Sequence, residues 1–307
     1  MTSPSFDTYR RLAESVPVDE TGSPLLTIGF CVELNFTDGI EPPQRQAGHD
    51  IYADYFGLTQ KWLRWMVDPK TKHYRAMTPE MTPAHWLSMQ PAERWVWFIT
   101  AHGGVRFDTV SEYEFEALGT GPVGLETSFL GATFPATFFA MERPDVDPVA
   151  LVRRWATWLK PMHGTAGLGV ITPLDEGRHA AAGPARRALL LRHPGLDLHR
   201  PSATADWEKG LRCVNWLTVL GDALLATLGG VDAIRASLPA GLLLHEYPGG
   251  AILQAGPHPE AGDMHYDQWP AHYRNAARIV RPVQAEFTGA FRGFDPAESR
   301  DWLHRFD

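Results

Sequence analysis

The chain has 307 residues, of which 44% are hydrophobic, so it is long enough to bury a large core in one or two domains. It carries 36 acidic and 28 basic residues, a formal net charge of -8. This balance argues against a nucleic-acid-binding protein, whose affinity comes largely from lysine and arginine. The two cysteines, Cys31 and Cys213, each lie in an apolar run and indicate buried thiols rather than a disulfide framework.

The N-terminus lacks the cationic and apolar regions of a secretion signal. No apolar run approaches the ~20 residues that cross a bilayer. We therefore expect a cytoplasmic protein without membrane contact.

The first half of the chain is predicted to contain both helices and strands. An amphipathic helix is expected at residues 6–16, and the apolar run at residues 25–36 predicts a strand. After a loop at residues 41–48, Asp50 precedes a predicted helix with apolar side chains at steps of three or four. That stripe comprises Ile51, Tyr55, Leu58, Trp62 and Trp65. The other elements expected are a helix beginning at Thr82 and Pro83 and strands at residues 94–107, 111–119 and 124–135.

The second half continues in the same way. Asp147 and Pro148 mark the start of a helix, and residues 211–220 are apolar enough for a central strand in which Trp216 is buried. The remaining expected elements are a strand at residues 165–172, helices at 185–193, 221–230, 231–239 and 270–283, a hairpin at 241–256 and a capped tail helix at 295–306. No linker separates independent units, so the sequence predicts a single α+β domain over residues 1–307, with a mixed, largely antiparallel sheet and helices packed on it.

The strand expected at residues 111–119 carries the sharpest acidic feature of the chain. Its three carboxylates fall on one face and its apolar side chains on the other, because strand side chains alternate. The acidic face comprises Glu112, Glu114 and Glu116. A solvated sheet face explains the pattern, and a surface that binds a basic partner is the second interpretation.

The stretch at residues 249–283 concentrates potential metal ligands, namely His258, Asp263, His265 and His272. Successive histidines are seven residues apart, but the intervening prolines and glycine forbid one continuous helix. A strand followed by a loop and a helix explains these residues without a metal, and no cofactor is expected. A metal-dependent hydrolase using the four residues is the competing hypothesis.

Motifs of enzymatic chemistry are missing from the sequence. The run His102–Gly104 resembles an esterase oxyanion loop, but no Gly-x-Ser-x-Gly turn accompanies it. The glycines of residues 164–169 precede a predicted strand instead of following one, so they do not form a dinucleotide loop. We therefore expect no catalytic residues.

Several segments, in this order, resemble the type VI secretion immunity family of bacteria. They are HGTAGLG at residues 163–169, VNWLTVLGDALLATLGG at 214–230, GGAILQAGPHPEAGD at 249–263 and YRNAARIVRPV at 273–283. The resemblance runs from about residue 25 to residue 283, with a less typical N-terminal portion.

The resemblance implies a non-enzymatic immunity protein that binds a cognate effector toxin and silences it by occluding its active site. A nuclease is the toxin most compatible with an acidic, cytoplasmic inhibitor, because a nuclease presents lysine and arginine to phosphate. Glu112, Glu114 and Glu116 would be spaced about 6.6 to 6.8 Å along an extended strand, close to single-strand phosphate spacing, and are the predicted toxin-binding residues. Oligomeric state is left open.

Overall fold

The computed structural model describes residues 9, 12, 16–20, 22–90, 96–121, 127–199, 210–287 and 289–307. Most of the helix predicted at residues 6–16 lies outside them. The strands are β1 (Thr27–Phe36), β2 (Trp65–Val67), β3 (Tyr74–Ala76), β4 (Val96–His102), β5 (Glu114–Thr120), β6 (Ser128–Pro135), β7 (His163–Ile171), β8 (Asp197–Leu198), β9 (Leu217–Gly221), β10 (Leu242–Tyr247) and β11 (Gly250–Ala255). The α-helices are α2 (Pro42–Thr59), α3 (Pro83–Met89), α4 (Phe138–Met141), α5 (Pro148–Leu159), α6 (Glu176–Ala181), α7 (Gly183–Arg192), α8 (Asp222–Thr227), α9 (Gly230–Ala236), α10 (Tyr273–Val280) and α11 (Pro296–Leu303).

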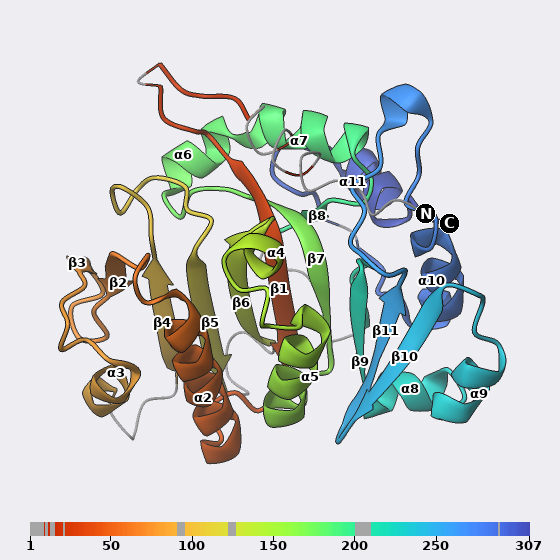
Figure 1. The fold of residues 1–307 in the computed structure, drawn as a ribbon, viewed down its shortest axis with the longest axis horizontal. Coiled ribbons are helices and arrows are strands. Elements are labelled where there is room, and N and C mark those ends of the chain that lie inside the picture. Colours follow the sequence, from red (N-terminus) through yellow and green to blue (C-terminus); the bar gives the residue numbers. More distant parts are fainter. Residues whose placement is uncertain are drawn as a thin grey trace.

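The described strands form one 11-stranded sheet (Figure 1). Its order is β10-β11-β9-β7-β1-β6-β5-β4-β2-β3, with β8 beside β7. Every pair is antiparallel except β7 and β8. The predicted α+β class with a mixed, largely antiparallel sheet is therefore confirmed.

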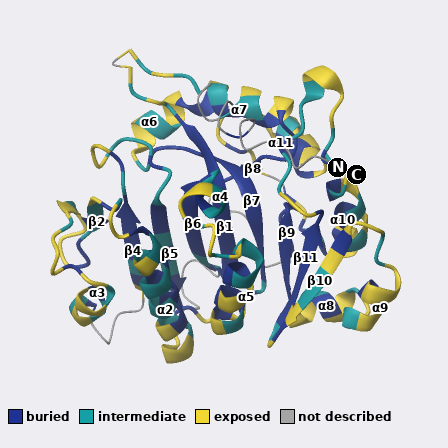
Figure 2. Ribbon diagram, viewed as in Figure 1, coloured by how far each residue is buried: buried dark blue, intermediate teal, exposed yellow. Residues whose placement is uncertain are grey.

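Helices α2 and α5 cover the middle of the sheet, and the strands beneath them are almost entirely buried (Figure 2). In β1, Phe30, Val32 and Leu34 face these helices and join the larger hydrophobic cluster. Trp216 is 3% exposed in the same cluster, as predicted. A second cluster contains Leu190 of α7 and Trp302 of α11, and it packs on Ile28 and Val170, at the end of the sheet where β1 begins and β7 ends (Figure 1).

The opposite face of β1 is polar and tightly covered. Glu33 lies there, and Arg212 Nη2 is 3.5 Å from its Oε2 and 2.9 Å from Asp197 Oδ2. Burial raises the pKa of Glu33, although the Arg212 charge opposes the shift. A Cβ on Gly167 would lie 2.2 Å from Asn215 Oδ1, so the glycines of β7 make room for the segment carrying Arg212 and Asn215.

The boundaries predicted for two elements are wrong. The central strand expected at residues 211–220 is confined to β9, because residues before Leu217 cross the polar face instead of joining the ladder. Helix α2 begins at Pro42, inside the expected loop, because a proline in the first helical turn sacrifices no hydrogen bond. It ends at Thr59, so Trp62 lies beyond it and Trp65 opens β2.

Helix starts were predicted well from their capping residues. Thr82 Oγ1 accepts a hydrogen bond from His85 N at 3.2 Å, and Asp147 Oδ1 accepts one from Val149 N at 2.9 Å. Each cap is followed by a proline at the first helical position. Within the described ranges, each helix falls short of the length or the apolar character that a bilayer span requires.

Candidate functional site

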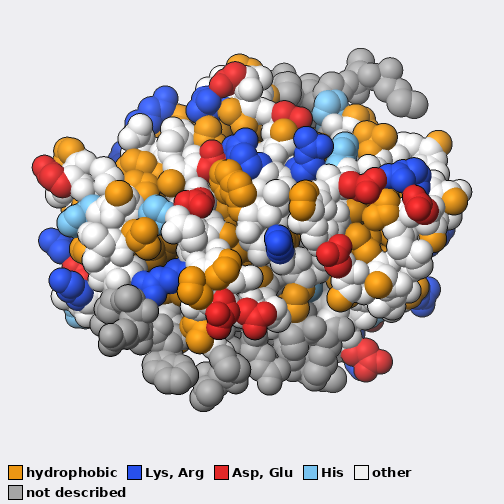
Figure 3. Space-filling view, turned by 90° about the horizontal axis from the view of Figure 1, so that it is seen from below, with side chains coloured by type: hydrophobic (Ala, Val, Ile, Leu, Met, Phe, Trp, Pro, Cys, Tyr) orange, Lys and Arg blue, Asp and Glu red, His pale blue; other side chains and the backbone are white. Residues whose placement is uncertain are grey.

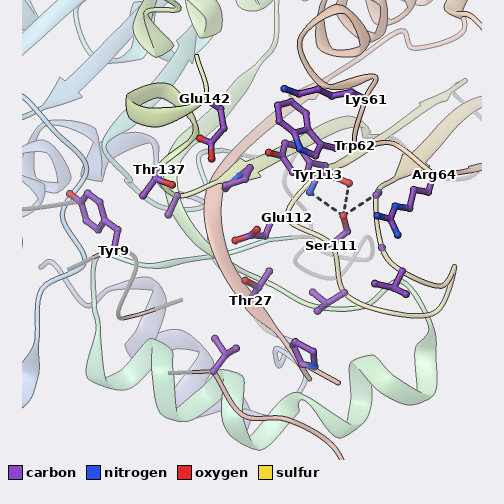
Figure 4. Close-up of a pocket in the computed structure, with 18 residues that line it drawn as sticks. Tyr9, Thr27, Lys61, Trp62, Arg64, Ser111, Glu112, Tyr113, Thr137 and Glu142 are labelled. Atoms are coloured by element: carbon purple, nitrogen blue, oxygen red, sulfur yellow. Dashed lines mark hydrogen bonds between the residues drawn. The ribbon is translucent and has the colours of Figure 1, made fainter. Parts of the chain in front are cut away.

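An open cleft of about 680 Å³ lies beside α4, between the ends of α2, β4 and β6 (Figure 4). Three connecting segments form most of its wall. Lys61 and Trp62 follow α2, Ser111 and Glu112 precede β5, and the short run from Pro135 to Glu142 begins at the end of β6 and includes α4. All three lie at the ends of the sheet strands or of α2, where binding residues are commonly held by a rigid scaffold.

The backbone leading into β5 is held by Ser111. Its hydroxyl donates a hydrogen bond to Tyr113 O at 2.8 Å and accepts one from Gly103 N at 3.1 Å (Figure 4). Two residues after Ser111, the Tyr113 ring stacks on the Trp62 ring, with the ring centroids 4.6 Å apart and the ring planes at 9° to each other. This stacked pair fixes one wall of the cleft, and Lys61 Nζ lies 3.9 Å above the Trp62 ring.

Two carboxylates, Glu112 and Glu142, point into the cleft (Figure 4). Burial raises the pKa of Glu112, and the nearby Glu142 charge raises it further, while a hydrogen bond with Thr27 acts in the opposite direction. Among the described residues neither carboxylate has an ion-pair partner. The pair is therefore suited to a cation from another molecule.

The predicted exposed row of three glutamates does not form. Glu114 is 2% exposed, and its Oε1 is 3.5 Å from His199 Nε2. Glu116 pairs in register with Gly131 of β6, whose missing side chain leaves space for the His199 ring. The alternation itself is correct, because Phe115 packs in the core against Tyr52. Only the exposure of the acidic face was misjudged, and toxin binding by Glu112, Glu114 and Glu116 stays a prediction.

The four candidate metal ligands do not converge. Asp263 forms a bidentate ion pair with Arg192 at 2.9 and 3.1 Å, and the His272 ring packs against Gly241 and Gly256. His258 and His265 are exposed. No group of three or more metal-binding side chains occurs within the ranges that the structure describes. The hydrolase hypothesis therefore lacks the geometry on which it depended.

The excess of acidic residues does not form one broad acidic surface on the described part of the face opposite α6 and α7. In the described part of this face, red and blue side chains are interspersed with scattered apolar ones (Figure 3). The described part of this face therefore presents no broad single-sign field to a partner.

Comparison with known proteins identifies the family. The family model TsiV, described as type VI immunity for VRR-NUC, matches residues 46–306. The chain belongs to the TsiV family. Among solved structures, the Pseudomonas aeruginosa T6SS protein PA0821 is similar, with a TM-score of 0.83 and 22% sequence identity over 98% of this chain and 91% of that one. At this identity the likeness establishes a shared fold. A search of curated proteins found no match.

Sequence reasoning missed most of this TsiV cleft. Trp62 was assigned to a helix, and Glu142 drew no interpretation, because its neighbour in the cleft is 30 residues away along the chain. Glu112 was selected, but as part of an exposed row. A signal for Glu142 was present in its position just after a short apolar run, but the sequence did not show what that run faces.

Proposed function

We propose that this protein binds a VRR-NUC effector nuclease of a type VI secretion system in the cytoplasm and neutralises it by occluding its active site. The family match over residues 46–306 carries the proposal. The two carboxylates of the cleft, which have no ion-pair partner within the described ranges, support it, because a nuclease has to present cationic groups to phosphate. The inhibitor acts by binding alone and performs no reaction.

Such an inhibitor needs rapid and tight binding, since the effector cleaves nucleic acid until it is captured. Complementary charge raises association rates to about 10⁸ to 10⁹ per molar per second at low salt. A standard interface of about 1,600 Å² is enough for tight binding when its central contacts are well packed. The rigid sheet behind the cleft holds the binding residues in place before the effector arrives, which limits the entropy cost.

The test is inhibition of the VRR-NUC nuclease carried by the same genome. Purified protein is titrated into the nuclease and cleavage of DNA is measured, with an unrelated nuclease as the control. We expect cleavage by the VRR-NUC enzyme to fall in proportion to added protein and to stop at a fixed molar ratio. Full cleavage at a large excess of the protein would contradict the proposal.

The compartment is tested in cells that express the effector. The protein, produced without an added export signal, is expected to restore growth of cells producing the nuclease internally. Protection that appeared only when the protein was exported to the periplasm would show that the cytoplasmic assignment is wrong.

A further inference from the structure

A second pocket of about 360 Å³ adjoins the acidic cleft, and Tyr9 and Ala136 line both. Its walls are mainly apolar, with Phe139 of α4, Val149 of α5 and Trp216 among them. The Trp216 ring contacts Phe30 edge to face at 6.1 Å, and its Nε1 donates to Gly256 O at 2.9 Å. The apolar floor of this pocket is therefore rigid.

We propose that the cleft and this pocket form one groove that seats a single segment of the VRR-NUC effector. A lysine or arginine side chain of that segment lies between Glu112 and Glu142, and a neighbouring apolar side chain lies against Phe139 and Trp216. The inference rests on the proposed function and names the surface and the partner chemistry that carry it out.

The acidic end of the groove selects for a cation. Glu112 and Glu142 approach one space from different segments, and burial of Glu112 beside a like charge disfavours its ionised form. A cation bound between them offsets both the repulsion between the two carboxylates and the cost of burying a charged Glu112. Lys61 does not supply it, because its ammonium group lies over the Trp62 ring, and Arg64 is exposed at the other end of the cleft (Figure 4).

Two polar side chains at the apolar end of the groove already have hydrogen-bond partners within the protein. The side-chain amide of Gln254 is already used at both ends, with Oε1 2.7 Å from His245 Nε2 and Nε2 donating to Gly256 O at 2.9 Å. Tyr9, at the junction, donates its hydroxyl hydrogen to Pro259 O. With these polar groups engaged, displacement of water by an apolar side chain is favourable.

The acidic end is tested with the double substitution Glu112→Gln and Glu142→Gln. The matched control is Glu41→Gln with Glu286→Gln, two exposed residues outside the groove, so both variants have the same net charge. Binding to the purified VRR-NUC nuclease domain is followed by stopped-flow kinetics. We expect the cleft variant to dissociate about 10- to 100-fold faster than the parent protein, and the control to change mainly the association rate.

The junction is tested with Ala136→Trp, which places a large ring where the two pockets meet. We expect at least a tenfold loss of affinity for the same nuclease domain. Ala140→Trp, on α4 in the apolar pocket, provides a second obstruction away from the strand end. Thermal unfolding shows which of the two variants remain folded, and only the affinities of folded variants are compared with that of the parent protein.

The outcomes separate the inference from the function on which it rests. If the parent protein inhibits the nuclease but the cleft variant dissociates at the parent rate, the groove is not the binding surface and the inference is wrong. Parent-like affinity in a folded Ala136→Trp or Ala140→Trp protein overturns the continuous groove. If the parent protein neither binds nor inhibits the nuclease, the proposed function itself is wrong.

Discussion

Glu112 connects stability to binding at the scale of single residues. Its pKa is raised in the folded state by burial and by Glu142, relative to the ordinary value of 4.5. The folded state therefore holds the Glu112 proton more tightly than the unfolded chain does. The stabilisation that comes from protonated Glu112 is complete when the pH lies below the ordinary pKa of a glutamate. It is lost as the pH rises through the raised pKa of the folded state.

Glu112→Gln should consequently stabilise the protein more at pH 7 than at pH 4, relative to the parent. The amide stays uncharged at both values, so it avoids the cost of burying a carboxylate that the parent protein bears at pH 7. Thermal unfolding of both proteins at the two pH values measures the difference, with the exposed Glu286→Gln as control. An equal difference in Tm at pH 4 and pH 7 would disprove the assignment. Stabilisation combined with weaker nuclease binding is typical of a functional site.

The tail helix α11 depends on its N-cap at the scale of elements. Asp295 Oδ1 accepts a hydrogen bond from Glu298 N at 2.8 Å, and Glu298 Oε2 accepts one from Asp295 N at 3.1 Å. Asp295→Ala is expected to lower the free energy of unfolding by about 1 kcal/mol. Denaturant unfolding measures this loss, and Asp301→Ala on the exposed side of the same helix serves as control. An unchanged unfolding midpoint in Asp295→Ala would mean that the cap contributes nothing.

At the scale of the whole molecule, the net charge of -8 should steer a cationic nuclease toward this protein. Screening shortens the reach of these charges, since the Debye length is about 10 Å at 0.1 M salt and about 3 Å at 1 M. We expect the association rate with the VRR-NUC nuclease to fall more than about tenfold between low and high salt while dissociation changes much less. Stopped-flow measurements over a salt series test this, and a flat association rate would refute electrostatic steering.

The sequence by itself determined the features that depend on local chemistry. Alternation placed Phe115 in the core, the caps Thr82 and Asp147 located two helix starts, and the apolar run around Trp216 indicated burial. These features depend on the alternation of side chains along a strand and on hydrogen bonds that a cap makes to backbone groups a few residues away. Both can be predicted from residues that are close together in the sequence.

Only the tertiary structure decided which polar groups meet. Glu114 is buried because His199 occupies the space above Gly131, and Glu112 faces Glu142 because β6 delivers α4 to the mouth of the cleft. The same packing engaged Asp263 with Arg192 and so dispersed the predicted metal ligands. Such contacts join residues tens of positions apart, and whether a charge faces water or protein depends on the element that packs above it.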